Sequence, residues 1–385
     1  MKTTKEYSPF SRPKSSRSLM AIAILALVFF SNCVARIPPK STSKTTPAPI
    51  TILTEPVAPP GASQTPFLTE SISSSAPAQD TAVPPISQTE IAYTPLAAQS
   101  QGINAAINWL HTQQDAQTGG FTSETNSIEV LLTIGANQEK ASDWRSSPDS
   151  PSLLDYWIAQ GPAYSQKGAA EAGKLAAALL AAGGCWPQGA KSPWDYYDFE
   201  SGIFDVQPGF QAWAMLGALA FEREIPLRAR EYLQSQVQPN GAWEWNTGFG
   251  GDSNTTSLAI EALLAAGEPV TSDYITNGLN FLKTSQNSDG GFIYQPGSTT
   301  PAASDSNSTA YAIQAILAVG GDPANPAWTI ENQNPIQFLQ SLQQVDGSFE
   351  WQFGNGPNLP ATAQAISALL GKYLPYQIGT IAGCP

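Results

Sequence analysis

Two short sequence units alternate through most of the chain, and their regular return constrains the fold more than any other feature. One unit is an amphipathic stretch that ends in Gln and is followed by a Gly-containing turn and an aromatic residue. It occupies residues 109–121, 232–243, 281–292 and 338–349. The other unit opens at Asp252, Asp305 and Asn358, at intervals of 53 residues, and leads into an alanine-rich run. Such alternation predicts an array of similar helix pairs.

The composition of the two units predicts which helices are buried. Asp252 with Asn254, and Asp305 with Asn307, offer side-chain oxygens to the free N–H groups of a helix start. The runs that follow are nearly uncharged, which is typical of helices surrounded by protein. The Gln-ended stretches are more polar, so we expect them on the outside. The turn glycines allow the aromatic residue to fold back against the helix end.

Weaker copies earlier in the sequence complete the count. They predict inner helices at about 127–135, 169–182 and 210–221, an outer helix at 153–159, and a shortened outer partner near 194–199. Six outer–inner pairs are enough to close a ring. The sequence therefore predicts an all-α fold, an (α/α)6 toroid or barrel over residues 99–376, followed by a tail at 377–385.

The Gln-to-aromatic turns resemble the QW repeats of triterpene cyclases and the related repeats of protein prenyltransferases. Those families share an α/α toroid of six inner and six outer helices. Within that superfamily the chain looks most like the toroid of bacterial relatives of transcobalamin and intrinsic factor. Three stretches carry this resemblance: 174–184, 305–310 and 363–372. The resemblance covers about 99–376 and implies the fold, because toroids host cyclases, transferases and binders that do no chemistry.

Departures from the family patterns argue against both familiar activities. The resemblance implies that a proton-initiated cyclase needs an Asp-x-Asp-Asp motif, and the corresponding place reads Asp252-Ser253-Asn254-Thr255. An amide such as that of Asn254 cannot donate the required proton. Prenyltransferases hold zinc with Asp, Cys and His, but the only histidine, His111, lies in the first helix pair. We therefore expect a protein without catalytic residues and without a metal site.

The resemblance to cobalamin carriers implies a ligand and a second domain that would complete its site. In that family the corrinoid is clasped between the toroid and a smaller β-rich domain, whereas this chain ends about a dozen residues after its last expected helix. A corrinoid such as cobalamin, or another hydrophobic small molecule, is then the expected ligand, with a partner domain or chain completing the site. Inner-helix starts in such toroids face the central funnel. The expected ligand-binding residues are Asp252, Asn254, Asp305, Asn307, Asn358, Trp243, Trp245 and Trp351.

Each of these residues also has a purely structural interpretation. The Asp and Asn residues are helix caps, and Trp243, Trp245, Trp351 and Phe353 can pack the hinges between outer and inner helices. Two other functions stay open. One is an extracytoplasmic enzyme, either of the terpenoid-cyclase or prenyltransferase type or a glycan-cleaving (α/α)6 enzyme. The glycan-cleaving enzyme would use carboxylates, with Asp195, Asp198, Glu200, Asp205 and Glu244 as candidates. A protein-binding scaffold is the other alternative.

The distribution of charge excludes nucleic acid as a partner. The chain has a formal net charge of −13, and phosphate binding needs clustered Lys and Arg. Residues 1–98 carry +3 and residues 99–385 carry −16. With one histidine, a site that needs two imidazoles is excluded as well.

The first 98 residues are predicted to serve export. Residues 1–35 combine a basic start with an apolar run at 19–30, too short to span a bilayer, and so resemble a signal peptide. Cys33 is a candidate for lipidation; ordinary cleavage after Ala35 and an uncleaved anchor are the alternatives. Residues 36–98, with 12 prolines and many Ser and Thr, are predicted to be a disordered linker. All three alternatives predict an extracytoplasmic domain. The expected form is a membrane-anchored lipoprotein, which meets the membrane only through its N-terminal anchor.

Two cysteines remain in the predicted domain. In an oxidising compartment Cys185 and Cys384 are expected to form a disulfide that ties an early part of the domain to its end. Two unpaired buried thiols are the alternative.

Overall fold

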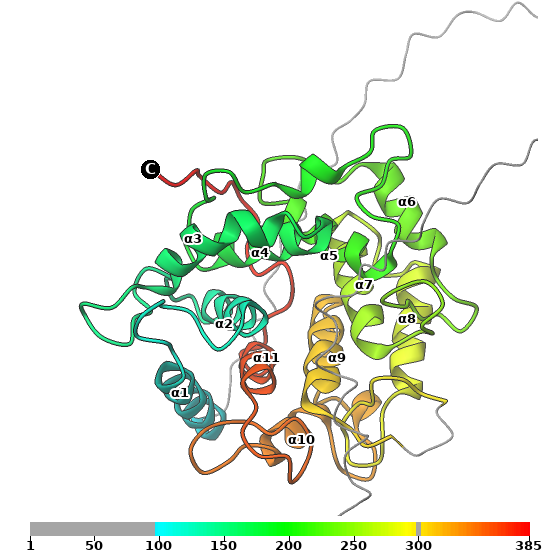
Figure 1. Cartoon of the computed structure of the whole chain (residues 1–385). Coiled ribbons are helices and arrows are strands. Elements are labelled where there is room, and N and C mark those ends of the chain that lie inside the picture. The colour runs from blue at the N-terminus through cyan, green and yellow to red at the C-terminus, as the bar shows by residue number, and fades with distance from the viewer. Residues whose placement is uncertain (1–96, 298–301) are drawn as a thin grey trace, which may run out of the picture. The chain divides into compact units, whose positions relative to one another are not determined.

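The computed structural model describes residues 97–297 and 302–385 (Figure 1). The predicted signal peptide, the lipidation of Cys33 and nearly all of the predicted linker lie outside the described residues, so they stay predictions. Within the described part, no helix is long and apolar enough to cross a bilayer.

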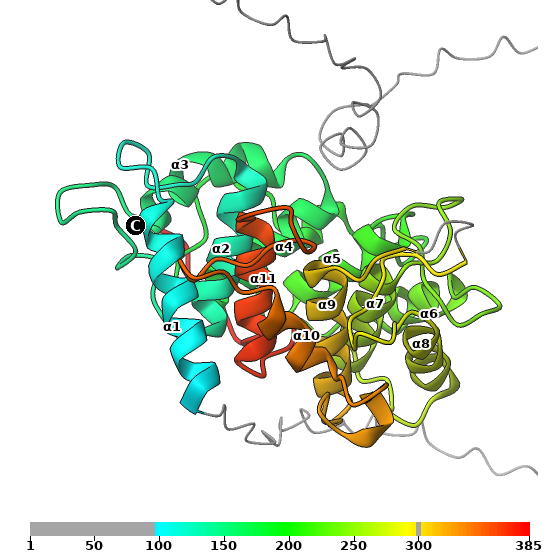
Figure 2. The same ribbon diagram turned by 90° about the horizontal axis from the view of Figure 1, so that it is seen from below.

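Six helices form a closed inner ring. They are α2 (Glu124–Ala136), α4 (Ala169–Ala181), α5 (Pro208–Ala218), α7 (Ser253–Ala265), α9 (Ser306–Ala318) and α11 (Leu359–Leu369). Each inner helix contacts the next, and α11 returns to contact α2 (Figures 1 and 2). Most residues of α4, α5 and α7 are buried, as the apolar, alanine-rich composition of these stretches predicts.

The outer layer consists of five α-helices and one short 3-10 helix. They are α1 (Ala97–Thr112), α3 (Leu153–Ser165), η1 (Pro193–Tyr196), α6 (Leu227–Ser235), α8 (Asp273–Thr284) and α10 (Pro335–Ser341), with η2 (Pro326–Trp328) preceding α10. The predicted six pairs and the shortened third outer partner are thus observed. In the described ranges extended pairing is limited to isolated bridges. The all-α toroid is confirmed.

Glycines let two inner helices approach each other closely. A Cβ atom added to Gly217 on α5 would lie 2.0 Å from the carbonyl oxygen of Gly173 on α4, and one added to Gly173 would lie 2.2 Å from the carbonyl oxygen of Trp213. These distances leave no room for a methyl group, so backbone packs against backbone at this contact.

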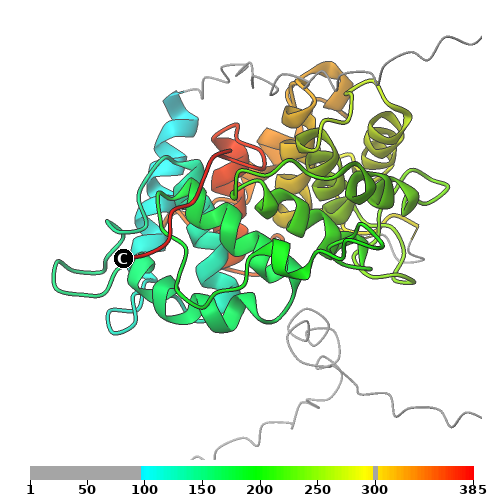
Figure 3. The same cartoon turned by 90° about the horizontal axis from the view of Figure 1, so that it is seen from above.

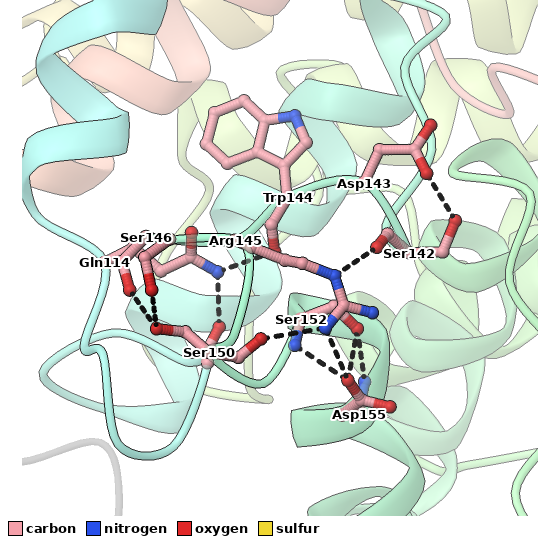
Figure 4. A network of polar contacts seen from close by, with 11 residues as sticks. Gln114, Ser142, Asp143, Trp144, Arg145, Ser146, Ser150, Ser152 and Asp155 are labelled. Atoms are coloured by element: carbon pink, nitrogen blue, oxygen red, sulfur yellow. Dashed lines mark hydrogen bonds and ion pairs between the residues drawn. The ribbon is translucent and has the colours of Figure 1, made fainter.

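The glutamine of the repeat joins its own turn to a neighbouring pair. Gln286 Nε2 donates to the carbonyl oxygens of Gly290 and Trp328, at 3.1 and 2.8 Å. Gln114 makes the same pair of bonds, to Gly119 and Trp144; Figure 4 shows the bond to Trp144 within a larger polar network. The recurrence of a Gln shortly before a turn glycine is explained by this double use of one amide.

Candidate functional site

The inner-helix starts are built as buried caps. Asp252 Oδ1 accepts from Thr255 N at 2.7 Å, Asp305 Oδ1 from Ser308 N at 2.8 Å, and Asn358 Oδ1 from Ala361 N at 2.9 Å. Asp252 and Asp305 are 1% and 3% exposed. Burial raises the pKa of each of these two carboxyls to about 6, against the hydrogen bonds that lower it.

The aromatic residues before these caps connect one repeat to the next. Trp243 is fully buried, and its indole N–H donates to the carbonyl oxygen of Leu233 at 2.7 Å. Trp245 and Trp351 are partly buried, and their carbonyl oxygens accept from Gly209 N and Ser306 N, the starts of the preceding inner helices. These hydrogen bonds join the segments between outer and inner helices to neighbouring helices, as the predicted hinge role requires.

The two asparagines lie one residue inside the helix starts and are only partly buried. Asn307 Nδ2 donates to Gln364 Oε1 on the neighbouring helix α11. Asn254 Oδ1 accepts from Ser253 Oγ at 3.3 Å. Unlike Asp252, Asp305 and Asn358, these two asparagines do not accept the capping hydrogen bond of a helix start. The ligand-binding role of the whole set stays a prediction.

The lumen of the inner ring is almost full. A cavity of about 10 Å³, with room for one water molecule, remains within it. Its lining includes Glu129, Trp213, Tyr311, Gln314 and Tyr376. At this cavity the ring therefore encloses side chains and little empty space.

Sequence reasoning missed the charged residues of this lumen. Glu129 on α2 pairs with Lys174 on α4, and the Lys174 ammonium lies 4.8 Å from the centre of the Trp213 ring. Glu261 on α7 is 1% exposed, its Oε1 accepts from Leu374 N at 2.9 Å, and burial raises its pKa well above the usual range. Charged residues in the middle of otherwise apolar helices were the signal that could have found them.

The acidic residues proposed for glycan cleavage take part in local loop structure. Asp195 closes a capping box with Ser192 at η1. Asp198 accepts from Glu200 N and Ser201 Oγ. Glu244 Oε2 accepts from Gly248 N and Gly250 N, both at 2.9 Å. Glu350 uses its carboxylate in the same way, with Gly354 N and Gly356 N.

The single histidine stacks on a buried tryptophan. The ring centres of His111 and Trp144 are 3.8 Å apart, and Glu139 accepts from the Trp144 indole N–H. Burial lowers the pKa of His111. Together with Lys140 and Asp143 these residues line an open hollow of about 440 Å³. The described residues contain no group of three or more His, Cys, Asp or Glu side chains able to hold a metal ion.

The loops that precede the inner helices expose aromatic rings to solvent. Phe249 is 59% exposed, Phe353 63% and Tyr294 45%. Neighbouring loops are joined side by side, because Gln295 Nε2 donates to Phe249 O and Gln352 Nε2 donates to Ala303 O. We call residues 245–250, 292–297 and 349–356 the aromatic loop face.

Cys185 and Cys384 form a disulfide in the structure. Both cysteines are partly exposed. The bond attaches the end of the chain to the segment that follows α4.

Comparisons with known proteins found one family model and several solved structures that are similar to the chain. Residues 201–377 match the family model of the squalene-hopene cyclase C-terminal domain. No curated protein matches the chain. Similar solved structures include a protein from Actinoplanes, 14% identical over 71% of this chain and 99% of that one, with a TM-score of 0.49. The type II terpene cyclase MstE from Scytonema is 14% identical over 71% and 97%, at 0.47. Protein geranylgeranyltransferase-I of Candida albicans is 14% identical over 72% and 86%, at 0.38. By its closed double ring the described domain has an α/α toroid fold, and residues 201–377 are similar to the squalene-hopene cyclase C-terminal domain.

Proposed function

We propose that this toroid is a non-catalytic binding module whose ligand lies on the aromatic loop face. The observation that carries the proposal is the filled lumen. A cavity of about 10 Å³ falls far below the roughly 300–1,000 Å³ of sites that enclose a small molecule. A reaction chamber within the ring therefore has no support, and the exposed loops around the inner-helix starts are the better candidate.

The loop face has the chemistry of a surface for an uncharged, partly apolar ligand. Phe249, Tyr294 and Phe353 offer rings, and the same loops carry the amide residues Asn246 and Gln352. Residues 245–250 and 292–297 contain no charged side chain. A flat molecule with a large apolar face, such as a corrinoid, fits this combination, and a partner domain would cover its other side.

The loops are held in place before any ligand arrives. Glu244 and Glu350 each bind two glycine N–H groups of their own loop. Thr247 N donates to Gln207 Oε1 at 2.8 Å, which ties the first loop to the preceding one. A rigid aromatic surface loses little conformational entropy on binding, which favours affinity.

Thermal unfolding of the full chain with cobalamin or cobinamide tests the proposal. Binding to the folded state raises the midpoint as the ligand concentration exceeds Kd. The Phe249→Ala/Phe353→Ala variant is expected to lose this rise. Val270→Ala removes a 51% exposed side chain between α7 and α8 and serves as the matched control. An unchanged midpoint at large excess of both corrinoids would overturn the corrinoid proposal.

A terpenoid-cyclase type of enzyme is the second candidate. The family model on residues 201–377 favours it, as does the buried carboxyl of Glu261, which accepts a hydrogen bond from the cavity-lining Leu374. Incubation with squalene and with geranylgeranyl substrates, followed by mass spectrometry, tests it. Cyclic product that disappears in Glu261→Gln would replace the binding-module proposal, and the absence of product removes this candidate.

A further inference from the structure

The C-terminal segment, residues 371–385, crosses the end of the inner ring at which the inner helices finish. Figures 1 and 3 show it leaving α11 and running past α4 and α5 toward α3. On the way it places Leu374 and Tyr376 at the lumen, where both line the small cavity. Leu374 is 3% exposed. The segment therefore occupies the space that an empty ring would offer to a ligand.

Two buried acceptors of the inner ring are met by this segment. Glu261 Oε1 accepts from Leu374 N at 2.9 Å, and Gln314 Oε1 accepts from the Tyr376 hydroxyl at 2.8 Å. Glu261 and Gln314 are 1% and 3% exposed. The second carboxyl oxygen of Glu261 has no hydrogen-bond partner. The lumen thus presents polar groups to its occupant, in a lining that combines aromatic rings such as Trp213 and Tyr311 with further polar side chains such as Thr133 and Gln364.

Beyond the lumen, main-chain hydrogen bonds and the buried side chain of Ile381 hold the segment. Ile381 N donates to Ala220 O at 2.9 Å, Trp186 N to Ala382 O at 2.7 Å, and Cys384 N to Trp186 O at 2.9 Å. Between the lumen and these bonds the chain is exposed, with Ile378 at 54%. The covalent attachment is the Cys185–Cys384 disulfide, and both of its residues are partly exposed at the surface, where a reductant can approach.

We propose that the lumen is a second binding site, for an apolar group that carries a phenol hydroxyl, and that residues 371–385 are its intramolecular occupant, latched by the Cys185–Cys384 disulfide. The recognition chemistry is the one that Tyr376 uses now: a ring packed near Trp213 and Tyr311, and a hydroxyl donated to Gln314. Breaking the latch lets the segment leave and opens the site. This inference concerns the lumen and does not depend on the ligand of the aromatic loop face.

Opening the latch is a balanced dithiol–disulfide exchange. A dithiol such as dithiothreitol loses two electrons and two protons and becomes a cyclic disulfide, while the protein disulfide is reduced to the thiols of Cys185 and Cys384. The Cys185→Ser/Cys384→Ser variant reaches the unlatched state without a reductant. The two routes control for each other.

Hydrogen exchange of the full chain tests the latch. With dithiothreitol, or in the double Ser variant, amides of residues 374–384 are expected to exchange at least ~10-fold faster, while α7 and α9 keep their protection. Unchanged exchange in the segment would overturn the proposal. Equal acceleration in the inner helices would overturn it too, because the disulfide would then hold the whole fold and not a separable occupant.

Restoration of a missing ring tests the site. In Tyr376→Ala the vacated space is expected to take 4-methylphenol, which raises the thermal midpoint, whereas toluene raises it less because it has no hydroxyl for Gln314. The Gln314→Met/Tyr376→Ala variant should treat the two compounds alike. No stabilisation by 4-methylphenol, or an equal effect of toluene in Tyr376→Ala, contradicts the proposal.

A milder variant covers the case in which Tyr376→Ala does not fold. Tyr376→Phe keeps the ring and removes only the donor to Gln314. It is expected to accelerate exchange of residues 374–384 several-fold in the oxidised protein, with the inner ring unaffected. Exchange equal to that of the unmodified chain would show that the hydroxyl does not hold the segment, and would overturn the assignment of Gln314 as the acceptor.

Discussion

At the scale of single residues, Asp252 and Asp305 hold helix starts from positions that water scarcely reaches. Each carboxylate accepts a cap N–H, which favours the charged form, but burial outweighs this and raises the pKa of each carboxyl to about 6. Such a group binds its proton more tightly in the folded than in the unfolded chain. Protonation of Asp252 and Asp305 therefore stabilises the folded state relative to the unfolded chain.

This shift predicts a pH dependence of stability. Because the folded pKa is raised, the stabilising contribution is complete below the unfolded value of about 3.8 and is lost as the pH rises through 6. Asp252→Asn and Asp305→Asn keep a capping oxygen but do not titrate. In urea unfolding, the free energy of unfolding of the unchanged protein should fall between pH 4 and pH 7. In each variant this fall should be smaller, by up to ~3 kcal/mol. Parallel pH profiles would contradict the shift.

The lumen ion pair gives a second residue-scale prediction. Glu129 and Lys174 side chains are 8% and 14% exposed and contact each other. Lys174→Met leaves a buried carboxylate unpaired and is expected to cost about 3–5 kcal/mol. Glu129→Gln/Lys174→Met should cost less than the sum of the single changes, since neither variant residue needs a partner. Additive losses in urea unfolding would show that the pair is not coupled.

At the scale of helices, the α4–α5 contact depends on two missing side chains. Gly217→Ala places a methyl group against the Gly173 backbone, where the nearest atom is 2.0 Å away. The helix-propensity gain of about 1 kcal/mol is outweighed, because backbone cannot move aside as a flexible side chain can. Net destabilisation of about 1–3 kcal/mol is expected, measured by urea unfolding. Gly379→Ala, whose added atom meets nothing nearer than 3.9 Å, should change little.

The helices themselves were predictable because their signals are local. A cap such as Asp305 and its apolar run lie within a dozen residues, and the 53-residue interval repeats them. Inner helix α2 starts three residues before its expected start, at Glu124, because Ser123 caps it while Ser127 accepts from Phe121 N. The exact start of a helix is therefore decided by capping contacts that the apolar pattern of the sequence does not reveal.

The filling of the lumen was not predictable from these signals. The Glu261–Leu374 bond joins residues 113 positions apart, and no periodicity marks such a pair. The segment expected as a tail from 377 onward contains Ile381, which is 7% exposed and packs into the core. Candidate sites inferred from helix starts alone consequently missed the groups that face the ring centre.

At the scale of the whole molecule, the closed ring makes every repeat an interior repeat. The seam lies between the last pair and the first, where α11 contacts both α1 and α2. Gln343 closes it by donating to Gly347 O at 3.1 Å and to Gly102 O on α1 at 2.7 Å. Gln286 makes the equivalent bonds in the middle of the array. In an open array the end repeats fray first, since each repeat is supported only by its neighbours.

Closure therefore predicts that damage at the seam and damage in mid-array have the same consequence. Gln343→Ala and Gln286→Ala each remove two hydrogen bonds, and each should lower the free energy of unfolding by about 1–3 kcal/mol. Both variants should still unfold in one transition, with an unchanged dependence on urea, by circular dichroism and by tryptophan fluorescence. If Gln343→Ala alone gave a separate early transition for the first or last pair, the seam would be an end, and the toroid would behave as an open solenoid.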